Sequence, residues 1–173
     1  MSGIGNSAAF QELIEQHRGI LYKVARAYCS LEEERQDLIQ EMMIQIWQAL
    51  PRYNAQYKSS TWIYRIALNV AISYYRKTTT QQRRQQALDA KALQGVEADS
   101  SEKERQFRLL EQFISELKEL DRALMVLYLE DRNHAEIAEI LGISISNVAT
   151  KVGRIKDKLK QRFSQHQNQS NGR

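Results

Sequence analysis

Aromatic rings, amides and cations are concentrated in the stretch from Ser59 to Lys77, SSTWIYRIALNVAISYYRK. Rings can stack on unpaired bases and cations can bind phosphates, so this mixture could hold single-stranded nucleic acid. The stretch has no Pro or Gly, opens with residues that suit a helix N-cap, and repeats apolar residues at helical spacing. The predicted apolar face of this helix consists of Ile63, Ile66, Ala67, Val70 and Tyr74. The other surface is expected to carry Trp62, Tyr64, Arg65, Leu68, Asn69, Tyr75, Arg76 and Lys77.

The residues of this helix alone leave two interpretations open. Either the helix offers a surface for unpaired DNA, or its rings lie in the core and its cations form a solvated face. A family resemblance favours the first interpretation. The segment resembles the helix with which the extracytoplasmic function (ECF) sigma factors of bacterial RNA polymerase open a promoter. The chain departs from that family at Leu68, where a cation is frequent, and at Ser73, where Asp is frequent. The matching residues are Ser60, Thr61, Trp62, Tyr64, Arg65, Ile66, Ala67, Asn69, Val70, Ala71, Ile72, Tyr74, Arg76 and Lys77.

The segment before this helix, PRYNAQYKS, is predicted to be a loop that bears rings and amides. A pocket for a flipped base needs rings that stack and amides that hydrogen-bond its Watson–Crick edge. In ECF sigma factors the loop at this place captures a base of the −10 element. The spacing does not identify which of Tyr53, Asn54 and Tyr57 lines a pocket, and one Tyr could simply cover the core. The residues assigned to single-stranded −10 DNA are Tyr53, Asn54, Tyr57, Lys58, Trp62, Arg65, Asn69, Arg76 and Lys77.

Another helix is predicted upstream of the loop, from about Ser30 to Pro51. Ser30 and Glu33 have the spacing of a capping box. Ile44 is an apolar residue among amides and acids, which is typical of a small docking surface but also occurs without a function. The segment DLIQEMMIQIWQAL resembles the part of sigma factors that binds the coiled coil of the polymerase β′ clamp. The residues that this resemblance assigns to core polymerase are Asp37, Gln40, Glu41, Ile44, Gln45 and Gln48.

Composition restricts the fold and the class of function. The chain has 173 residues with only seven Gly and one Pro, which favours long helices, and a first helix is predicted from Ser7 to Tyr28. Cys29 is the single cysteine, so an internal disulfide and a Cys-rich zinc site are excluded. The sequence has no apolar run of about 20 residues and no signal peptide, so a cytoplasmic protein without membrane insertion is expected. Motifs typical of phosphate-binding loops, metalloproteases and nucleophilic triads are missing from it, so no enzyme activity, metal or cofactor is expected.

The character of the chain changes after Lys77. Residues 78–104 are polar and nearly free of aromatic residues, which predicts a flexible linker. We therefore predict an all-α fold of two small helical domains. The expected boundaries are a sigma region 2-like domain over residues 1–77, the linker over 78–104, a four-helix domain resembling sigma region 4 over 105–164, and a disordered tail over 165–173.

Four helices are predicted in the second domain. Phe107 is expected to face inward from the first helix. The last two helices flank a short turn at Gly142 and have the spacing of a helix-turn-helix, with the final helix running from Ser144 to about Phe163. The expected start signals of the first three helices are Ser101 with Glu104, Asp121, and Asn133 with Glu136.

The final helix is expected to enter the major groove of DNA. Between Ser144 and Arg162 it carries six Lys or Arg residues and one acid, and its polar residues can hydrogen-bond base edges. The pattern EIAEILGIS followed by Val148 resembles the −35-binding domain of sigma factors and, more loosely, other bacterial regulators. The alternative to DNA binding is a helical hairpin whose basic face is only solvated. Ala149 replaces a common cation and Gly153 weakens the helix, so the −35 sequence differs or the contact is weaker. The residues assigned to −35 duplex DNA are Ser146, Asn147, Thr150, Lys151, Arg154 and Lys158.

The resemblance extends over about residues 8–163 and implies a dissociable ECF sigma factor. The implied partners are promoter DNA and bacterial core RNA polymerase, through its β′ clamp and β flap. Anti-sigma factors often hold members of this family inactive, although no residue of this chain identifies one. If the −35 contact is weaker, delivery of the polymerase could depend on another, DNA-bound recruiting partner. The alternative is a stand-alone helix-turn-helix regulator whose first half binds a ligand or dimerises. That alternative predicts tight duplex binding without polymerase, whereas a sigma factor alone should bind weakly.

Overall fold

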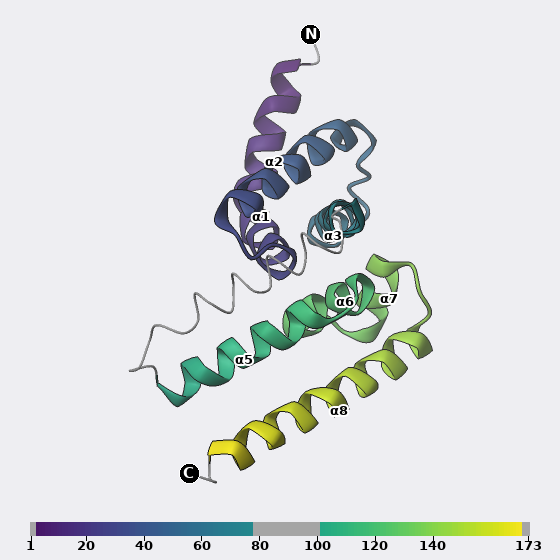
Figure 1. Ribbon diagram of the computed structural model, residues 1–173. Coiled ribbons are helices and arrows are strands. Elements are labelled where there is room, and N and C mark those ends of the chain that lie inside the picture. Colours follow the sequence, from purple (N-terminus) through teal and green to yellow (C-terminus); the bar gives the residue numbers. More distant parts are fainter. Residues whose placement is uncertain (1–2, 78–100, 171–173) are drawn as a thin grey trace. The chain divides into compact units, whose positions relative to one another are not determined.

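The computed structural model describes residues 3–77 and 101–170, and all regular secondary structure in these ranges is helical (Figure 1). The prediction of an all-α fold is confirmed. The chain divides into two compact units between residues 95 and 96. We call the described part of the first the N-terminal unit and that of the second the C-terminal unit. The helices are α1 (Gly3–Tyr28), α2 (Glu32–Ala49), the 3-10 turn η1 (Leu50–Arg52), α3 (Ser59–Lys77), α5 (Glu102–Glu116), α6 (Glu119–Leu129), α7 (His134–Leu141) and α8 (Ile145–Ser170).

In the N-terminal unit each of the three long helices packs against the other two. Periodic apolar residues of α1, α2 and α3 meet in one core, which buries the single cysteine, Cys29. Arg35 of α2 closes the end of α1: its Nε donates to the carbonyl of Cys29 at 2.9 Å and its guanidinium to the carbonyl of Ser30 at 3.1 Å. These bonds give partners to two backbone carbonyls of the short connection that follows α1. The largest fully buried side chains of this core are Leu21, Val24, Leu38, Met42, Ile46, Ile63, Tyr64 and Leu68.

In the C-terminal unit α5 lies along α8, while α6 and α7 pack against each other and α6 also packs on α8 (Figure 1). Arg122 of α6 is almost fully buried and donates to the carbonyls of Ser115 and Leu117, which joins α6 to the end of α5. The helix-turn-helix is made of α7 and α8. Gly142 ends α7 with φ of 67°, a left-handed conformation that glycine adopts without steric cost.

Several predicted helix starts are confirmed and two are wrong. Capping boxes are present at Ser101 with Glu104 and at Asn133 with Glu136. α2, however, begins after Leu31 without a side-chain cap, so the capping box predicted at Ser30 does not form. α6 begins after Lys118, which leaves Asp121 inside its first turn and not at the cap.

Two further predictions for the C-terminal unit differ from the structure. Phe107 is 54% exposed and does not face inward; among the described helices, α5 packs on α6 and α8. The predicted tail from Gln165 is helical up to Ser170, as a continuation of α8. The predicted linker lies outside the described residues except for residues 101–104, which form the start of α5. In the described ranges no helix combines the length and apolar character that a membrane span requires.

Candidate nucleic-acid interfaces

α3 buries a wider arc than its apolar repeat indicates. Tyr64 is 1% exposed and Leu68 is equally buried, so the prediction that both lie on the outer surface is wrong. The reason is that α3 packs against α1 on one side and α2 on another, and two neighbours cover more of a helix than one does. The buried tyrosine is therefore part of the core and is no candidate for base stacking.

A narrower exposed stripe remains on α3. Residues three, four or seven positions apart on a helix share a face, so Trp62, Arg65, Asn69 and Arg76 form one line along it. Arg65, Asn69 and Arg76 are exposed, and Trp62 is half-buried. Ser73 lies on the same line and is exposed, although the sequence analysis did not assign it to DNA. Its position four residues after Asn69 is the signal that could have identified it.

The loop before α3 presents one ring to solvent and fixes another. The Tyr53 hydroxyl donates to the Tyr57 carbonyl at 2.8 Å, and its ring centroid lies 4.7 Å from that of Trp62. Asn54 supports the same turn, because its Oδ1 accepts from the Gln56 backbone N–H at 3.0 Å. Tyr57, at the end of this turn, is 59% exposed. The loop therefore holds an exposed ring beside a half-buried pair of rings, with Lys58 exposed next to it.

The start of α3 is tied to α1 by a hydrogen bond between side chains. His17 Nε2 and Ser59 Oγ are 2.8 Å apart. His17 is half-buried. The bond fixes the residue at which the ring-bearing loop passes into the exposed stripe of α3.

The outer face of α2 is polar with an apolar centre. Asp37, Gln40, Glu41 and Gln48 are exposed, and Ile44 among them is 45% exposed. The remaining assigned residue on this face, Gln45, is half-buried, and its amide donates to Glu41 Oε1 at 3.0 Å.

Trp47 also contributes to this face. Its ring is exposed on one side and makes an edge contact with the Phe10 ring, with centroids 5.1 Å apart. The surface formed by Gln40, Glu41, Ile44 and Trp47 has the composition of a protein–protein contact, an apolar centre with a polar rim.

The second helix of the helix-turn-helix begins with a side-chain cap. Ser144 Oγ accepts the backbone N–H of Asn147 at 3.1 Å, and Ser144 and Ser146 hydroxyls are 3.2 Å apart. The Thr150 hydroxyl donates to the Ser146 carbonyl within the helix at 3.0 Å. The assigned residues Ser146, Asn147, Thr150, Arg154 and Lys158 are all exposed.

Lys151 differs from the other assigned residues of α8. It is only partly exposed, and its Nζ donates to Asp121 Oδ1 at 2.8 Å. Ile145, at the first position of α8, is exposed and was not assigned to DNA. It lies outside the buried repeat of Val148, Val152 and Ile155, which is the signal that could have drawn attention to it.

Two models of the sigma-70 family match the chain, and together they include both candidate interfaces. Sigma-70 region 2 matches residues 13–81 and Sigma-70 region 4 matches residues 107–159. The RNA polymerase sigma factor CnrH of Cupriavidus metallidurans is 30% identical over 90% of this chain and 86% of its own length. The ECF RNA polymerase sigma factor SigW of Bacillus subtilis is 25% identical over 92% and 91%. The chain belongs to the ECF family of RNA polymerase sigma factors.

Solved sigma factors share the fold. The structure of CnrH in complex with the cytosolic domain of CnrY matches with a TM-score of 0.67 at 22% identity, over 92% of this chain and 90% of that one. The sigma factor RpoE of Bartonella quintana, in complex with the anti-sigma factor NepR, matches with a TM-score of 0.64 at 16% identity, over 90% and 97%. At these identities the likeness concerns the fold.

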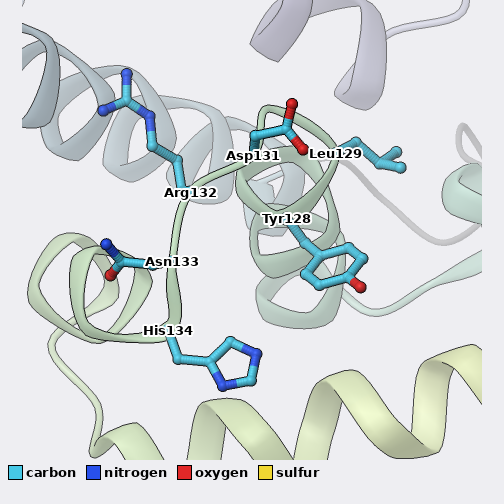
Figure 2. A pocket seen from close by; sticks show the side chains of 6 residues that line it. All are labelled: Tyr128, Leu129, Asp131, Arg132, Asn133 and His134. Atoms are coloured by element: carbon cyan, nitrogen blue, oxygen red, sulfur yellow. The ribbon is translucent and has the colours of Figure 1, made fainter.

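The connection between α6 and α7 of this sigma factor forms an open pocket (Figure 2). Asp131 in this turn has φ of 56°, and the backbone N–H of Arg132 returns to the Leu127 carbonyl at 3.2 Å. The pocket is lined by Tyr128, Leu129, Asp131, Arg132, Asn133 and His134.

Within residues 3–77 and 101–170 there is no group of three His, Cys, Asp or Glu side chains that could hold a metal ion.

Proposed function

We propose that this sigma factor brings core RNA polymerase to promoters, separates the strands of the −10 element with its N-terminal unit, and recognises the −35 duplex with its C-terminal unit. The single observation that carries the proposal is the loop before α3. It holds Tyr57 exposed beside the Tyr53–Trp62 ring pair, at the start of a stripe of amides and cations. On this proposal the protein acts in the cytoplasm and is not an enzyme, since the chemistry of transcription belongs to the polymerase.

Opening the duplex requires a surface that compensates for lost stacking. Extracting a base costs about a few kcal/mol, and stacking on a protein ring returns about 1–3 kcal/mol per base. Tyr57 and the Tyr53–Trp62 pair would supply rings, and Asn54 and Asn69 would supply amides for base edges. Because α3 is fixed on the core through Tyr64, the stripe is preorganised and little ordering entropy is lost on binding. The cations proposed to bind phosphates are Lys58, Arg65, Arg76 and Lys77.

The outer face of α2 would bind the β′ clamp of core polymerase. Ile44 and Trp47 offer exposed apolar area, and Glu41 and Gln40 offer a polar rim around it. The rest of the assigned set, Asp37, Gln45 and Gln48, would contribute polar contacts. We also propose a contact between the C-terminal unit and the β flap, on the family resemblance alone.

The C-terminal unit would place the first turns of α8 in the major groove. Asn147 suits the edge of adenine and Arg154 the edge of guanine, because each side chain can form two hydrogen bonds there. Ser146 and Thr150 would add single hydrogen bonds, and Lys158 would contact a phosphate. One solved relative is in complex with the cytosolic domain of CnrY, and another is in complex with the anti-sigma factor NepR. On that likeness we propose that an anti-sigma factor or another recruiting protein controls this chain as well.

The proposal is tested by transcription from genomic DNA with purified core polymerase, with and without the full-length chain. The chain should create discrete start sites, each preceded by a shared −10 and −35 sequence. A stand-alone regulator would instead bind duplex DNA tightly without polymerase and would create no new start sites. The absence of chain-dependent start sites with an active core enzyme would refute the proposal.

A further inference from the structure

Lys151 is engaged within the protein at the centre of the proposed −35 surface. Its ammonium donates to a carboxylate oxygen of Asp121 at 2.8 Å, and the two side chains are 29% and 26% exposed. Asp121 lies in the first turn of α6, so the pair joins the body of the C-terminal unit to the helix proposed to contact DNA. Asp121 and Lys151 are 30 residues apart in the sequence.

The position of Lys151 on α8 explains the pairing. Each residue of a helix is rotated by about 100° from the previous one, which places residue 151 next to the buried Val148 and Val152. Its side chain therefore emerges at the edge of the packed face, where Asp121 can reach it. Arg154 and Lys158 lie further round the helix and are exposed.

Releasing Lys151 to a DNA phosphate would gain little. The phosphate would only replace one anion by another, and the carboxylate left behind would be partly desolvated near the DNA. The partly buried pair is screened less by salt than exposed charges are. The N-terminal turn of α6 favours the ionised form of Asp121 through the helix dipole, so the carboxylate is available to pair with Lys151. The exchange of one anion for another, the desolvated carboxylate and the weak screening favour the internal pair over a contact with DNA.

We propose that Asp121 keeps Lys151 out of the DNA contacts and thereby lowers the affinity of the recognition helix for its duplex. Lys151 is then a positioning residue that fixes α8 against α6, while Arg154 and Lys158 contact the duplex. This inference rests on the proposed −35 function of the C-terminal unit. On this inference Asp121, which is not among the residues assigned to −35 DNA, controls the affinity for the promoter.

The experiment measures the binding of the full-length protein to a fluorescent duplex by anisotropy. The duplex carries the −35 region of a start site mapped with this chain, and a scrambled duplex is the reference. Titrations over a range of salt concentrations give the slope of log K against log [salt], which counts the phosphates neutralised. The variants are Asp121→Asn, Lys151→Met, Arg154→Met and the double variant Asp121→Asn/Lys151→Met, each checked for thermal unfolding. The matched control is Asp157→Asn, which makes the same change of net charge as Asp121→Asn but lies on α8.

The pair predicts a characteristic set of results. Asp121→Asn should bind about three- to tenfold more tightly at low salt, with a slope steeper by about 0.9, as expected for one additional phosphate contact. The double variant should lose this gain. Lys151→Met alone should keep the wild-type slope, and Arg154→Met should lose about tenfold in affinity. Asp157→Asn should not steepen the slope by the roughly 0.9 expected for an additional phosphate contact.

Two results would overturn the inference. One is a slope for Lys151→Met that is shallower by about 0.9, since this would mean that Lys151 already binds a phosphate. The other is folded Asp121→Asn protein with wild-type or weaker affinity. A different pair of results would refute the proposed −35 function itself. The wild-type protein would bind the −35 and the scrambled duplex with equal affinity, and Arg154→Met would leave that affinity unchanged.

Discussion

The two units of this sigma factor offer different chemistry on their exposed surfaces. The N-terminal unit exposes Tyr57 beside the Tyr53–Trp62 ring pair, whereas the exposed surface of α8 has Asn147, Arg154 and other polar or cationic residues. Rings bind unstacked bases, whose faces are free, and amides and guanidinium groups bind the edges of bases that remain paired. This difference is the basis of the proposal that one unit holds separated strands and the other binds duplex DNA.

The cores of the two units also differ in composition. In the N-terminal unit the largest fully buried residue is Tyr64, among aliphatic side chains. In the C-terminal unit a cation, Arg122, is buried and holds the connection between α5 and α6 through backbone carbonyls. If the units are independent, damage to one core should leave the other intact.

Arg122→Met should have the largest effect. Loss of the guanidinium leaves the carbonyls of Ser115 and Leu117 without this donor, which should cost about 2–4 kcal/mol of unfolding free energy in the C-terminal unit. Hydrogen exchange of the full-length protein can assign the loss to one unit. Arg105→Met, which removes an exposed cation of α5, is the control and should change little. Equal loss of protection in α1 to α3 would contradict the independence of the units.

Tyr57→Ala should reduce promoter opening by the free energy of one stacking contact, about 1–3 kcal/mol. The rate of open-complex formation by the holoenzyme should fall accordingly, with core binding unchanged, and Trp62→Ala should behave in the same way if it remains folded. Tyr22→Ala removes another exposed ring of the N-terminal unit and serves as the control. Normal opening rates for both loop variants would disprove the assignment to base capture.

Glu41→Arg should weaken binding to core polymerase by about 1–2 kcal/mol, because it places a cation in the rim around Ile44 and Trp47. Competition with a labelled sigma factor for core enzyme measures this affinity. Glu12→Arg makes the same change of charge at an exposed position of α1 and should have no such effect. Unchanged affinity for Glu41→Arg would remove α2 from the clamp contact.

The smallest expected effect concerns alkaline pH. Burial, with Cys29, Glu34 and Asp37 nearby, raises the pKa of Tyr74 from 10.0 to about 12. The folded state therefore retains this proton at pH values where the unfolded state has lost it. The contribution is fully present below pH 10 and is lost as pH rises from 10 to 12. Between pH 9 and 11 the wild type should lose stability relative to Tyr74→Phe, but not relative to a Tyr22→Phe control. A constant difference between wild type and Tyr74→Phe would contradict this assignment.

The sequence predicted the helices and most core residues because their signals are local. Apolar spacing, the capping boxes at Ser101 and Asn133, and Gly142 each act within a few residues. The exposed stripe of Trp62, Arg65 and Asn69 could likewise be predicted from helical spacing. The functions assigned to these residues remain predictions.

The errors arose where distant parts of the chain meet. Tyr64 is buried because α3 has two helical neighbours, a fact that the periodicity of α3 alone does not contain. The ion pair of Lys151 could likewise not be read from local spacing, because its partner Asp121 comes from another helix; the assignment of Lys151 to DNA stays a prediction. Asp121 itself resembled a helix cap because carboxylates are favoured throughout the first turn and not only at the N-cap.

The division of work between the two units is tested most directly by site-specific photo-crosslinking in open complexes. A photoreactive phenylalanine analogue at Tyr57 should crosslink to the non-template strand within the −10 element, and only after the promoter opens. The same group at Ile145 should crosslink to the −35 duplex before and after opening. Crosslinks from position 57 to duplex DNA or solely to polymerase, in complexes that initiate transcription, would contradict the account.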